Sequence, residues 1–553
     1  MLSPVRLHLR HAGALAALLS SLTMSLSGSS SASANPLPAP WNPDQGDGTY
    51  RNPLLFLDFP DPDGIRVGDD YFLVCSTFSH EPGLLLLKSR DLVNWRQVGY
   101  ALSRLQPPEF FAKPRRGCGV WAPSLRHHDG RFWIFYPDPD FGIYVVTATE
   151  FGGPWSEPTL VKAGRGLIDP CPLWDDDGQA YLIHGWAKSR AGINNVLTLH
   201  RLSPDGSRVL DPGRIIIDGA AFPGCTTLEG PKLYKRGGWY YVFAPAGGVE
   251  HGWQSVFRAR DIWGPYEERR VLAQGATPIN GPHQGAWIET PGGESWFIHF
   301  QDRGPFGRIP HLQPLRWRDD GWPVIGRDAD NDGCGEPVLR QAKPVVGGAS
   351  GPVLTLPAGD EFDDPGLGLQ WQWEAHHEDV WFSLSAAPGA LRLFAQPAAS
   401  LWDAPNVLTQ RALGPRSTVT TELVFAPRAP GERAGLVVMG RDYTWIGLRQ
   451  TSAGPRIVRG VCRGADQGNR VEEETVGPLV SAGRAQLRVQ VAEGASWIVS
   501  YSLDAGATWT SLGEPFAARQ GVWVGARLGL FALTASGSGA GGYADFPWWR
   551  VAP

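Results

Sequence analysis

The chain has 553 residues, more than one hydrophobic core usually contains, so two domains are expected. Its 50 Lys and Arg nearly balance its 55 Asp and Glu, for a net charge of −5, and no basic run stands out. This balance argues against nucleic acid and membrane as partners. The 24 Trp, 69 Gly and 48 Pro favour many short strands joined by tight turns.

The first 34 residues have the three parts of a signal peptide. A basic start is followed by a largely apolar stretch from Ala14 to Leu26 and by the small-residue cleavage site Ala32-Ser33-Ala34. The apolar stretch is too short to span a bilayer as a mature helix. We therefore expect the protein to be exported, either secreted or periplasmic, with an N-terminal extension over 35–48.

Six cysteines are scattered along the chain without a CxxC pair, so the usual metal–thiolate spacing is absent. An even number in an exported chain permits disulfides without specifying them, and buried free thiols are an equal alternative. No pairing is predicted.

Internal repetition is the most informative feature of the chain. A turn followed by an aromatic-rich strand recurs five times between residues 49 and 339, with a period of about 55 residues. Asp-Gly and Gly-Gly between apolar runs are hairpin signals, because such turns need positive φ angles. Four short strands per repeat predict a five-bladed β-propeller, and the missing helical periodicity argues against a TIM barrel. The five segments are Asp69–Val74, Asp129–Phe135, Asp177–Ile183, Gly237–Phe243 and Gly292–Ile298.

One position recurs at the same distance before each turn. Equivalent positions in successive blades are related by rotation about the propeller axis, so they should converge on one mouth of the central channel. Three of these five residues are carboxylates, and His283 stands beside the last of the five. The residues eight positions before the turns are Asp61, Trp121, Asp169, Glu229 and Gln284.

The predicted convergence of Asp61, Asp169 and Glu229 on one channel mouth requires an explanation. An Asp before Pro is usually a turn residue, and this alone would explain Asp61 or Asp169. Three acids around a narrow channel repel one another, however, and folding gives no reason to keep them there. An inverting glycosidase needs a carboxylate base to activate water and a carboxylic acid to protonate the leaving oxygen, roughly 6.5–9.5 Å apart. A third acid beside the proton donor would raise the donor's proton affinity by repulsion.

Three motifs in a fixed order carry a family resemblance: Phe59-Pro60-Asp61-Pro62, Ile168-Asp169-Pro170 and Glu229-Gly230-Pro231. Together they resemble glycoside hydrolase family 43, which contains β-xylosidases and α-L-arabinofuranosidases on a five-bladed propeller. The resemblance implies that Asp61 is the general base and Glu229 the general acid. It also implies that Asp169 tunes and orients the acid.

The resemblance extends to side chains that bind sugar. It continues through Ser76-Thr77-Phe78, Val120-Trp121-Ala122-Pro123 and Gly307-Arg308. It implies that Phe78 and Trp121 line the sugar subsite. It implies further that Arg308 contacts sugar hydroxyls and the central aspartate, Asp169.

His283 matches a histidine that family members place on the propeller axis, near a bound calcium or an ordered water. The stretch Gly281-Pro282-His283-Gln284-Gly285 departs from the family's commoner Gly-His-Gly form. A hydrogen-bonded core histidine is an equal alternative. We therefore expect no required cofactor and leave a structural calcium at His283 open.

A second domain is predicted over 358–553, after a linker over 340–357 that contains Pro, Gly and Ser. Its short alternating strands are typical of a β-sandwich. The closing stretch Ala544–Trp549 resembles the concanavalin-like, jelly-roll domain appended to many family 43 β-xylosidases, in which a sandwich loop reaches the pocket and closes it. A separate sugar-binding module or a structural lid is the alternative. The predicted fold class is all-β throughout.

The resemblance implies an inverting, exo-acting hydrolase that releases xylose or arabinose from plant hemicellulose fragments. Its partner is then an oligosaccharide or polysaccharide, and its oligomeric state stays open. One alternative is a non-catalytic sugar-binding propeller, against which the three aligned acids speak. Another is a retaining fructosidase-type propeller, but no Asn-Asp-Pro-Asn nucleophile motif stands near the start of the chain.

Overall fold

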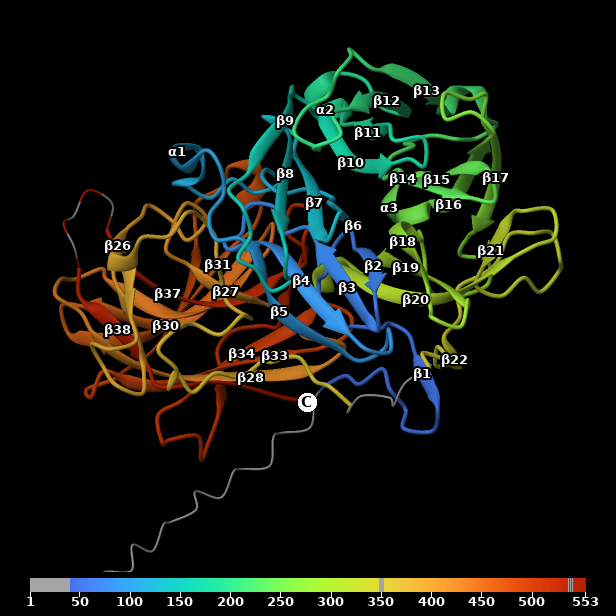
Figure 1. Ribbon diagram of the computed structural model, residues 1–553. Coiled ribbons are helices and arrows are strands. Elements are labelled where there is room, and N and C mark those ends of the chain that lie inside the picture. Colours follow the sequence, from blue (N-terminus) through green and yellow to red (C-terminus); the bar gives the residue numbers. More distant parts are fainter. Residues whose placement is uncertain (1–39, 348–352, 536, 538, 540) are drawn as a thin grey trace, which may run out of the picture. The chain divides into compact units, whose positions relative to one another are not determined.

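Five four-stranded antiparallel sheets follow one another along the chain, each built from four consecutive strands (Figure 1). The computed structural model describes residues 40–347, 353–535, 537, 539 and 541–553. The predicted signal peptide lies outside the described residues, as do 35–39 of the predicted extension and 348–352 of the predicted linker.

The blades have short strands whose bounds follow the predicted repeat. Each of the five aromatic-rich segments forms the second strand of its blade. The strands are, blade by blade, β2 (Asp63–Val67), β3 (Asp70–Cys75), β4 (Gly83–Ser89) and β5 (Trp95–Leu102); β6 (Ser124–His128), β7 (Arg131–Asp138), β8 (Gly142–Ala148) and β9 (Thr159–Ala163); β10 (Leu167–Trp174), β11 (Ala180–Trp186), β12 (Val196–Leu202) and β13 (Arg214–Asp218); β14 (Lys232–Arg236), β15 (Trp239–Ala246), β16 (Trp253–Ala259) and β17 (Glu267–Leu272); β18 (His283–Glu289), β19 (Ser295–Asp302), β20 (Arg308–Trp317) and β21 (Pro323–Ile325).

Two of the predicted hairpin turns have the backbone geometry that their residues indicate. Asp129 and Gly130 join β6 to β7 with φ angles of 48° and 69°. Gly237 and Gly238 join β14 to β15 with φ angles of 55° and 74°. Positive φ at both central residues is the signature of a type I′ hairpin, whose twist matches that of the flanking strands.

The first strands of the blades join neighbouring blades around the ring. β2 contacts β6, β6 contacts β10 and β10 contacts β14, while β18 of the fifth blade contacts β2 of the first. The ring therefore closes between blades five and one, and the predicted five-bladed β-propeller is confirmed. β1 (Thr49–Arg51) pairs with β22 (Arg340–Ala342), which ties the segment that enters the propeller to the segment that leaves it.

Three short helices interrupt the loops between the propeller strands: α1 (Pro108–Phe111), α2 (Lys188–Ala191) and α3 (Gly248–His251). No helix among the described residues has the length and apolar character needed to cross a membrane. All six cysteines lie in the described part of the chain, and none of them is paired.

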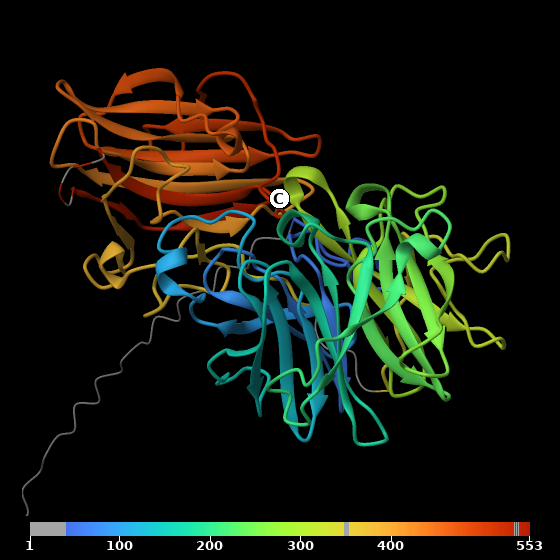
Figure 2. The same cartoon turned by 90° about the horizontal axis from the view of Figure 1, so that it is seen from above.

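The C-terminal domain consists of two sheets, coloured orange to red in Figure 2, and the predicted β-sandwich is confirmed. Their strands pair antiparallel except for β26, which pairs parallel with β37. The first sheet has the order β23-β27-β37-β29-β30-β31-β32 with β26 beside β37, and the second has the order β24-β25-β38-β28-β33-β34-β35 with β36 beside β34 and β39 beside β28. The strands of the first sheet are β23 (Gln372–Trp373), β26 (Gln396–Pro397), β27 (Leu408–Arg411), β29 (Arg433–Met439), β30 (Tyr443–Thr451), β31 (Gly454–Cys462), β32 (Glu473–Leu479) and β37 (Arg527–Thr534). Those of the second are β24 (Phe382–Ser383), β25 (Leu391–Phe394), β28 (Ser417–Ala426), β33 (Arg484–Val491), β34 (Ser496–Ser502), β35 (Thr510–Ser511), β36 (Phe516–Ala517), β38 (Tyr543–Phe546) and β39 (Trp549–Ala552).

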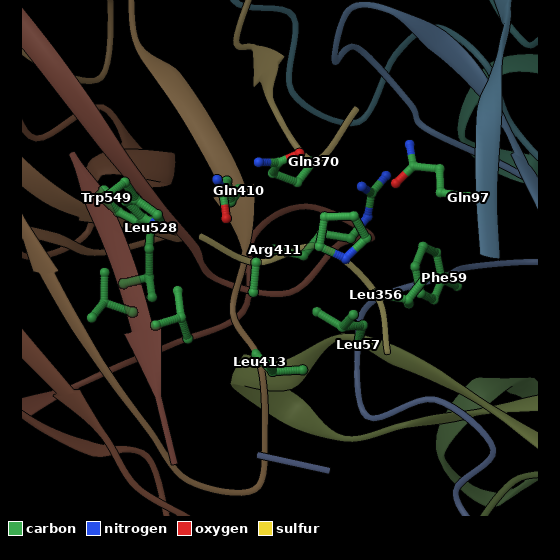
Figure 3. A pocket seen from close by; sticks show the side chains of 14 residues that line it. Leu57, Phe59, Gln97, Leu356, Gln370, Gln410, Arg411, Leu413, Leu528 and Trp549 are labelled. Carbon is green, nitrogen blue, oxygen red and sulfur yellow. The ribbon is translucent and has the colours of Figure 1, made fainter. Parts of the chain in front are cut away.

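Propeller and sandwich are packed against each other. Phe56 and Phe306 of the propeller belong to the same buried apolar cluster as the sandwich core, and Glu81 forms an antiparallel bridge with Trp373. A cavity of about 40 Å³ remains at this junction (Figure 3), lined among others by Phe59 and Arg411. None of the predicted catalytic or sugar-binding residues lines it, so we do not assign it as the substrate site.

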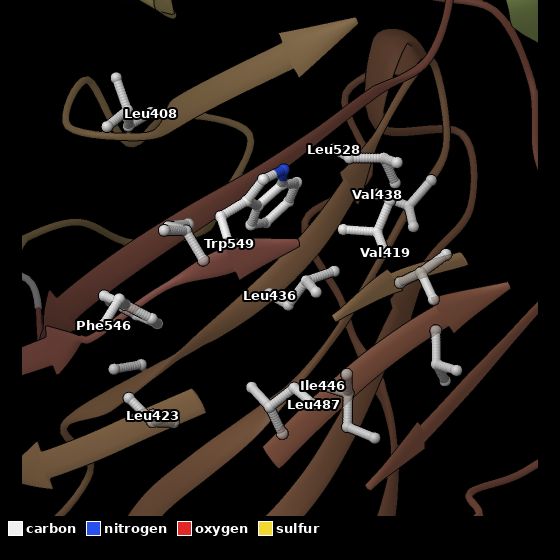
Figure 4. Packing of buried hydrophobic residues seen from close by; sticks show 14 of the residues in the cluster. Leu408, Val419, Leu423, Leu436, Val438, Ile446, Leu487, Leu528, Phe546 and Trp549 are labelled. Atoms are coloured by element: carbon white, nitrogen blue, oxygen red, sulfur yellow. The ribbon is translucent and has the colours of Figure 1, made fainter. Parts of the chain in front are cut away.

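The sandwich core lies between its two sheets. Leu436 and Ile446 of the first sheet and Leu423 and Leu487 of the second are fully buried in one cluster (Figure 4). The residues of β28 alternate between buried and half-buried along its whole length, as expected of a strand that packs one face on a core.

Candidate active site

The three predicted catalytic acids stand at or just before the first strand of their blades. Asp61 precedes β2 and Glu229 precedes β14, while Asp169 lies in β10. Asp61, Asp169 and Gln284 share a left-handed backbone, with φ angles of 53°, 56° and 43°. Such a conformation is uncommon outside glycine and clusters at functional sites. Its recurrence at equivalent positions shows that the blades present these residues in the same way.

Asp61 is held by two side chains and is 3% exposed. The Ser76 hydroxyl donates to Oδ2 at 2.6 Å, and Arg308 Nη1 donates to Oδ1 at 2.7 Å. Both carboxylate oxygens therefore have a donor, which fixes the orientation of the carboxylate.

Arg308 corrects one implication of the family resemblance. Its guanidinium pairs with Asp61, and no hydrogen bond joins it to Asp169 among the described residues. The reason is position: Arg308 opens β20 in blade five, and blade five lies beside blade one, which carries Asp61. The guanidinium also packs against three rings, those of Phe300 at 4.8 Å, Trp523 at 5.5 Å and Phe78 at 5.7 Å.

Asp169 lies beside Glu229 and is 2% exposed. The backbone N–H of Gly230 donates to Asp169 Oδ2 at 2.7 Å. A methyl group on Gly185 would stand 3.7 Å from both Asp169 Oδ2 and the Cα of Glu229, which shows how close the two acids are.

The two acids differ in their surroundings. Burial, and secondly the negative charge of Glu229, raises the pKa of Asp169 to about 8. The repulsion expected from the sequence therefore acts on the deeply buried Asp169, while the Glu229 side chain remains 25% exposed. A proton is thus retained beside Glu229 near neutral pH.

His283 contacts the predicted acid. Its Nε2 lies 2.7 Å from Glu229 Oε1, while its Nδ1 is buried without a hydrogen-bond partner. The free imidazole nitrogen suits an ordered water, whereas calcium prefers oxygen ligands. Beside it, Gln284 Oε1 is also buried without a hydrogen-bond partner. The group of three acids that could hold a metal among the described residues, Asp328, Asp330 and Asp332, does not include His283.

Aromatic side chains from both domains form the wall of the site. Phe78 and Trp121 meet edge to face with ring centroids 6.2 Å apart, and the backbone of Phe78 pairs with Val120. Trp523, from the sandwich segment between β36 and β37, stands 6.0 Å from Trp121 and is 41% exposed. Sequence reasoning missed Trp523, because this residue lies outside the repeat. It shows that a sandwich loop does reach the propeller site.

A cavity of about 390 Å³ opens between Arg308 and Trp523. None of the three predicted acids is among its lining residues, but Arg308, which pairs with Asp61, is. This volume is enough for a sugar unit, and its wall mixes polar and apolar groups as ligand sites do. The remaining lining residues are Val249, Glu250, Asn280, Asp302, Gly304, Gly307, Gln520 and Val524.

Comparison with known proteins agrees with this geometry. The family model for glycosyl hydrolases family 43 matches residues 50–323, and the model for the β-xylosidase C-terminal concanavalin A-like domain matches residues 359–552. A putative β-xylosidase of Xylanibacter ruminicola is 44% identical over 405 residues, which are 73% of this chain and 73% of that protein. The chain belongs to glycoside hydrolase family 43.

Two further family 43 proteins are similar over nearly the whole chain. A non-reducing end α-L-arabinofuranosidase of Bacteroides ovatus is 30% identical and covers 90% of this chain and 94% of its own length. The crystal structure of a xylan β-1,4-xylosidase from Bacillus halodurans has a TM-score of 0.81 at 27% identity, over 91% of this chain and all of that one. As a family 43 enzyme the chain is a glycosidase acting on carbohydrate, which excludes the non-catalytic propeller.

Proposed function

We propose that the protein is an inverting, exo-acting hydrolase that releases xylose or arabinose from the ends of hemicellulose fragments, as a β-xylosidase or α-L-arabinofuranosidase. One observation carries this proposal: Asp61, Asp169 and Glu229 come from three blades, and the charges of the first and last both act on Asp169. The relatives named as β-xylosidase and α-L-arabinofuranosidase support the choice of pentose substrates.

In this mechanism each acid has one task. Asp61 takes a proton from a water molecule that attacks the anomeric carbon, while Glu229 gives its proton to the glycosidic oxygen as the bond to that carbon breaks. Arg308 holds Asp61, and His283 holds Glu229. Asp169 and Glu229 share a proton near neutral pH, because two carboxyl groups this close do not both ionise readily. The released sugar then has the opposite anomeric configuration from the bond that was cut.

Exo action is supported by the loop that carries Trp523. This loop places Trp523 beside Trp121 and Arg308 at the propeller site, where it would close one side of the substrate pocket. A closed pocket accepts a chain end more readily than the middle of a polysaccharide.

The test is hydrolysis of 4-nitrophenyl β-xyloside and 4-nitrophenyl α-L-arabinofuranoside, with proton NMR of the first product before mutarotation. We expect release of a pentose whose anomeric configuration is inverted. Retained configuration would exclude Asp61 as a base, and a lack of activity on both pentosides would exclude the proposed substrates.

We also propose that the enzyme is exported, on the basis of the signal-peptide pattern over 1–34. The mass of the mature protein recovered outside the cytoplasm tests this. Removal of about 34 residues is expected, and an intact N-terminus on protein retained in the cytoplasm would contradict it.

A further inference from the structure

Asp58 is a buried carboxylate that receives hydrogen bonds from two distant parts of the chain. It lies three residues before Asp61, in the loop that leads into β2, and is 3% exposed. The backbone N–H of Arg308 donates to Oδ1 at 2.8 Å, and the backbone N–H of Gly525 donates to Oδ2 at 2.9 Å. The first donor belongs to blade five and the second to the sandwich.

Both donors adjoin the wall of the candidate active site. Arg308 carries the guanidinium that pairs with Asp61, and Gly525 follows Trp523 by two residues. Asp58 stands in the same segment as the predicted base, Asp61. Its side chain therefore connects this segment to Arg308, which orients the base, and to the sandwich loop that carries Trp523.

Asp58 lies so close to Gly307 and Gly525 that no side chain or water fits between them. A methyl group on Gly307 would lie 2.3 Å from Asp58 Oδ1 and 2.5 Å from the amide nitrogen of Gly525. A methyl group on Gly525 would lie 2.8 Å from the carbonyl carbon of Phe306. Glycine at both positions lets the sandwich loop approach the carboxylate directly.

Arg308 and the Trp523 loop, which both donate to Asp58, differ in the other hydrogen bonds that hold them. Arg308 is also held by its own carbonyl, which accepts from the Phe59 N–H at 3.0 Å. Within the sandwich, the loop carbonyls of Gln520 and Gly521 accept from Arg441 at 3.0 Å and 3.3 Å. Toward the propeller, the loop has the bond from the Ala526 N–H to the Pro305 carbonyl at 2.8 Å and the bond from Gly525 to Asp58. Loss of the carboxylate should therefore release the loop more than the arginine.

A buried carboxylate without an ion-pair partner is costly to a fold. Burial raises the pKa of Asp58, and no salt bridge joins it among the described residues. Packing alone does not explain why an acid stands here, whereas the need for two hydrogen bonds to backbone amides does.

We propose that Asp58 is a positioning residue that locks the Trp523 loop of the sandwich onto the propeller, so that both domains complete one substrate pocket. This inference rests on the proposed function for its kinetic readout. Asp58 acts through Trp523 and Arg308 and does not itself reach the pocket.

The variant Asp58→Asn tests this, because an amide can accept only one of the two hydrogen bonds and turns a donor toward the other N–H. We expect KM to rise about tenfold, the scale of a lost hydrogen bond to a charged group, with a smaller change in kcat. Trp523→Ala should raise KM similarly, and the double variant should be no worse than Trp523→Ala alone. Additive effects in the double variant, or an unchanged KM in Asp58→Asn, would overturn the proposal.

Asp91→Asn is the matched control. Asp91 is 2% exposed and also accepts two backbone N–H bonds, from Val93 at 3.0 Å and Asn94 at 2.7 Å, but both lie in its own turn. It should lower the melting temperature without changing KM. A rise in KM in both variants would show that Asp58 has only a structural role.

Hydrogen exchange of the amides provides a measurement that does not depend on activity. In the wild-type protein the Gly525 amide should exchange slowly although Trp523 nearby is exposed, because it is bonded to a buried acceptor. Fast exchange at Gly525 in the wild type would overturn the proposal even if Asp58→Asn failed to fold. If the wild type cleaved no pentoside, the proposed function would fail while this test of Asp58 would remain valid.

Discussion

The guanidinium of Arg308 donates to the carboxylate of Asp61 at 2.7 Å, joining the fifth blade of the propeller to the first at the substrate site. Both side chains are almost fully buried, with 8% and 3% exposed. Because the ring closes between these two blades, the pair links the last part of the propeller chain to the predicted base.

Arg308→Lys should lose activity, since lysine offers a point charge without the planar fork that reaches Asp61 and packs between the rings. We expect kcat/KM to fall at least about tenfold, the scale of one charged hydrogen bond. Steady-state kinetics on an aryl pentoside checks this. Arg303→Lys is the control, because Arg303 pairs with Glu493 at the surface, and it should behave as the wild type. Full activity in Arg308→Lys would show that the pair does not orient Asp61.

Asp61→Asn and Glu229→Gln should each lose about a hundredfold or more in turnover, the scale for acid–base groups. Glu229→Gln should retain more activity on an aryl glycoside, whose good leaving group needs less protonation, than on an oligosaccharide. Parallel kinetics on both substrates separates the roles. Asp177→Asn, in an exposed turn, is the control and should leave both rates unchanged. Equal losses of Glu229→Gln on both substrates would contradict its role as the acid.

Asp169 should make the folded protein less stable as pH rises. Its pKa is about 8 in the folded protein against an ordinary value of 3.8, so the folded state holds an extra proton between about pH 4 and pH 8. The free energy of unfolding then falls with pH in this window, by at most about 1.4 kcal/mol per pH unit from this group.

Asp169→Asn should remove this part of the pH dependence. The midpoint of urea unfolding, measured between pH 5 and pH 8, should fall less in the variant than in the wild type. Asp177→Asn should keep the wild-type profile. An identical profile in Asp169→Asn would mean that Asp169 ionises in the folded protein as readily as in the unfolded chain.

Removal of divalent cations should leave the enzyme unchanged. The free donor at His283 is one imidazole nitrogen, which suits a water better than calcium. Dialysis against EDTA, followed by kinetics and a melting curve, checks this expectation. A loss of activity that calcium restores would contradict it and would assign a metal to the channel.

The sequence alone predicted the propeller and the grouping of Asp61, Asp169 and Glu229. The reason is the repeat: when five segments share one strand pattern, equivalent positions are related by rotation, and a constant offset of eight residues becomes a ring of side chains. The alternating pattern of the C-terminal half predicted a sandwich for the same kind of reason, since a strand with one buried face repeats every two residues.

Only the tertiary structure decided which residues complete the site. Arg308 and Asp61 are 247 residues apart, and Gly525 and Asp58 are 467 apart, so no local pattern or repeat relates them. Trp523 reaches the pocket because the sandwich packs on the propeller. The sequence around Trp523 has no pattern that predicts this contact. Burial, which depends on the whole fold, likewise raises the pKa of Asp169. Repetition along the chain thus determines what symmetry brings together, whereas contacts between the two domains depend on packing.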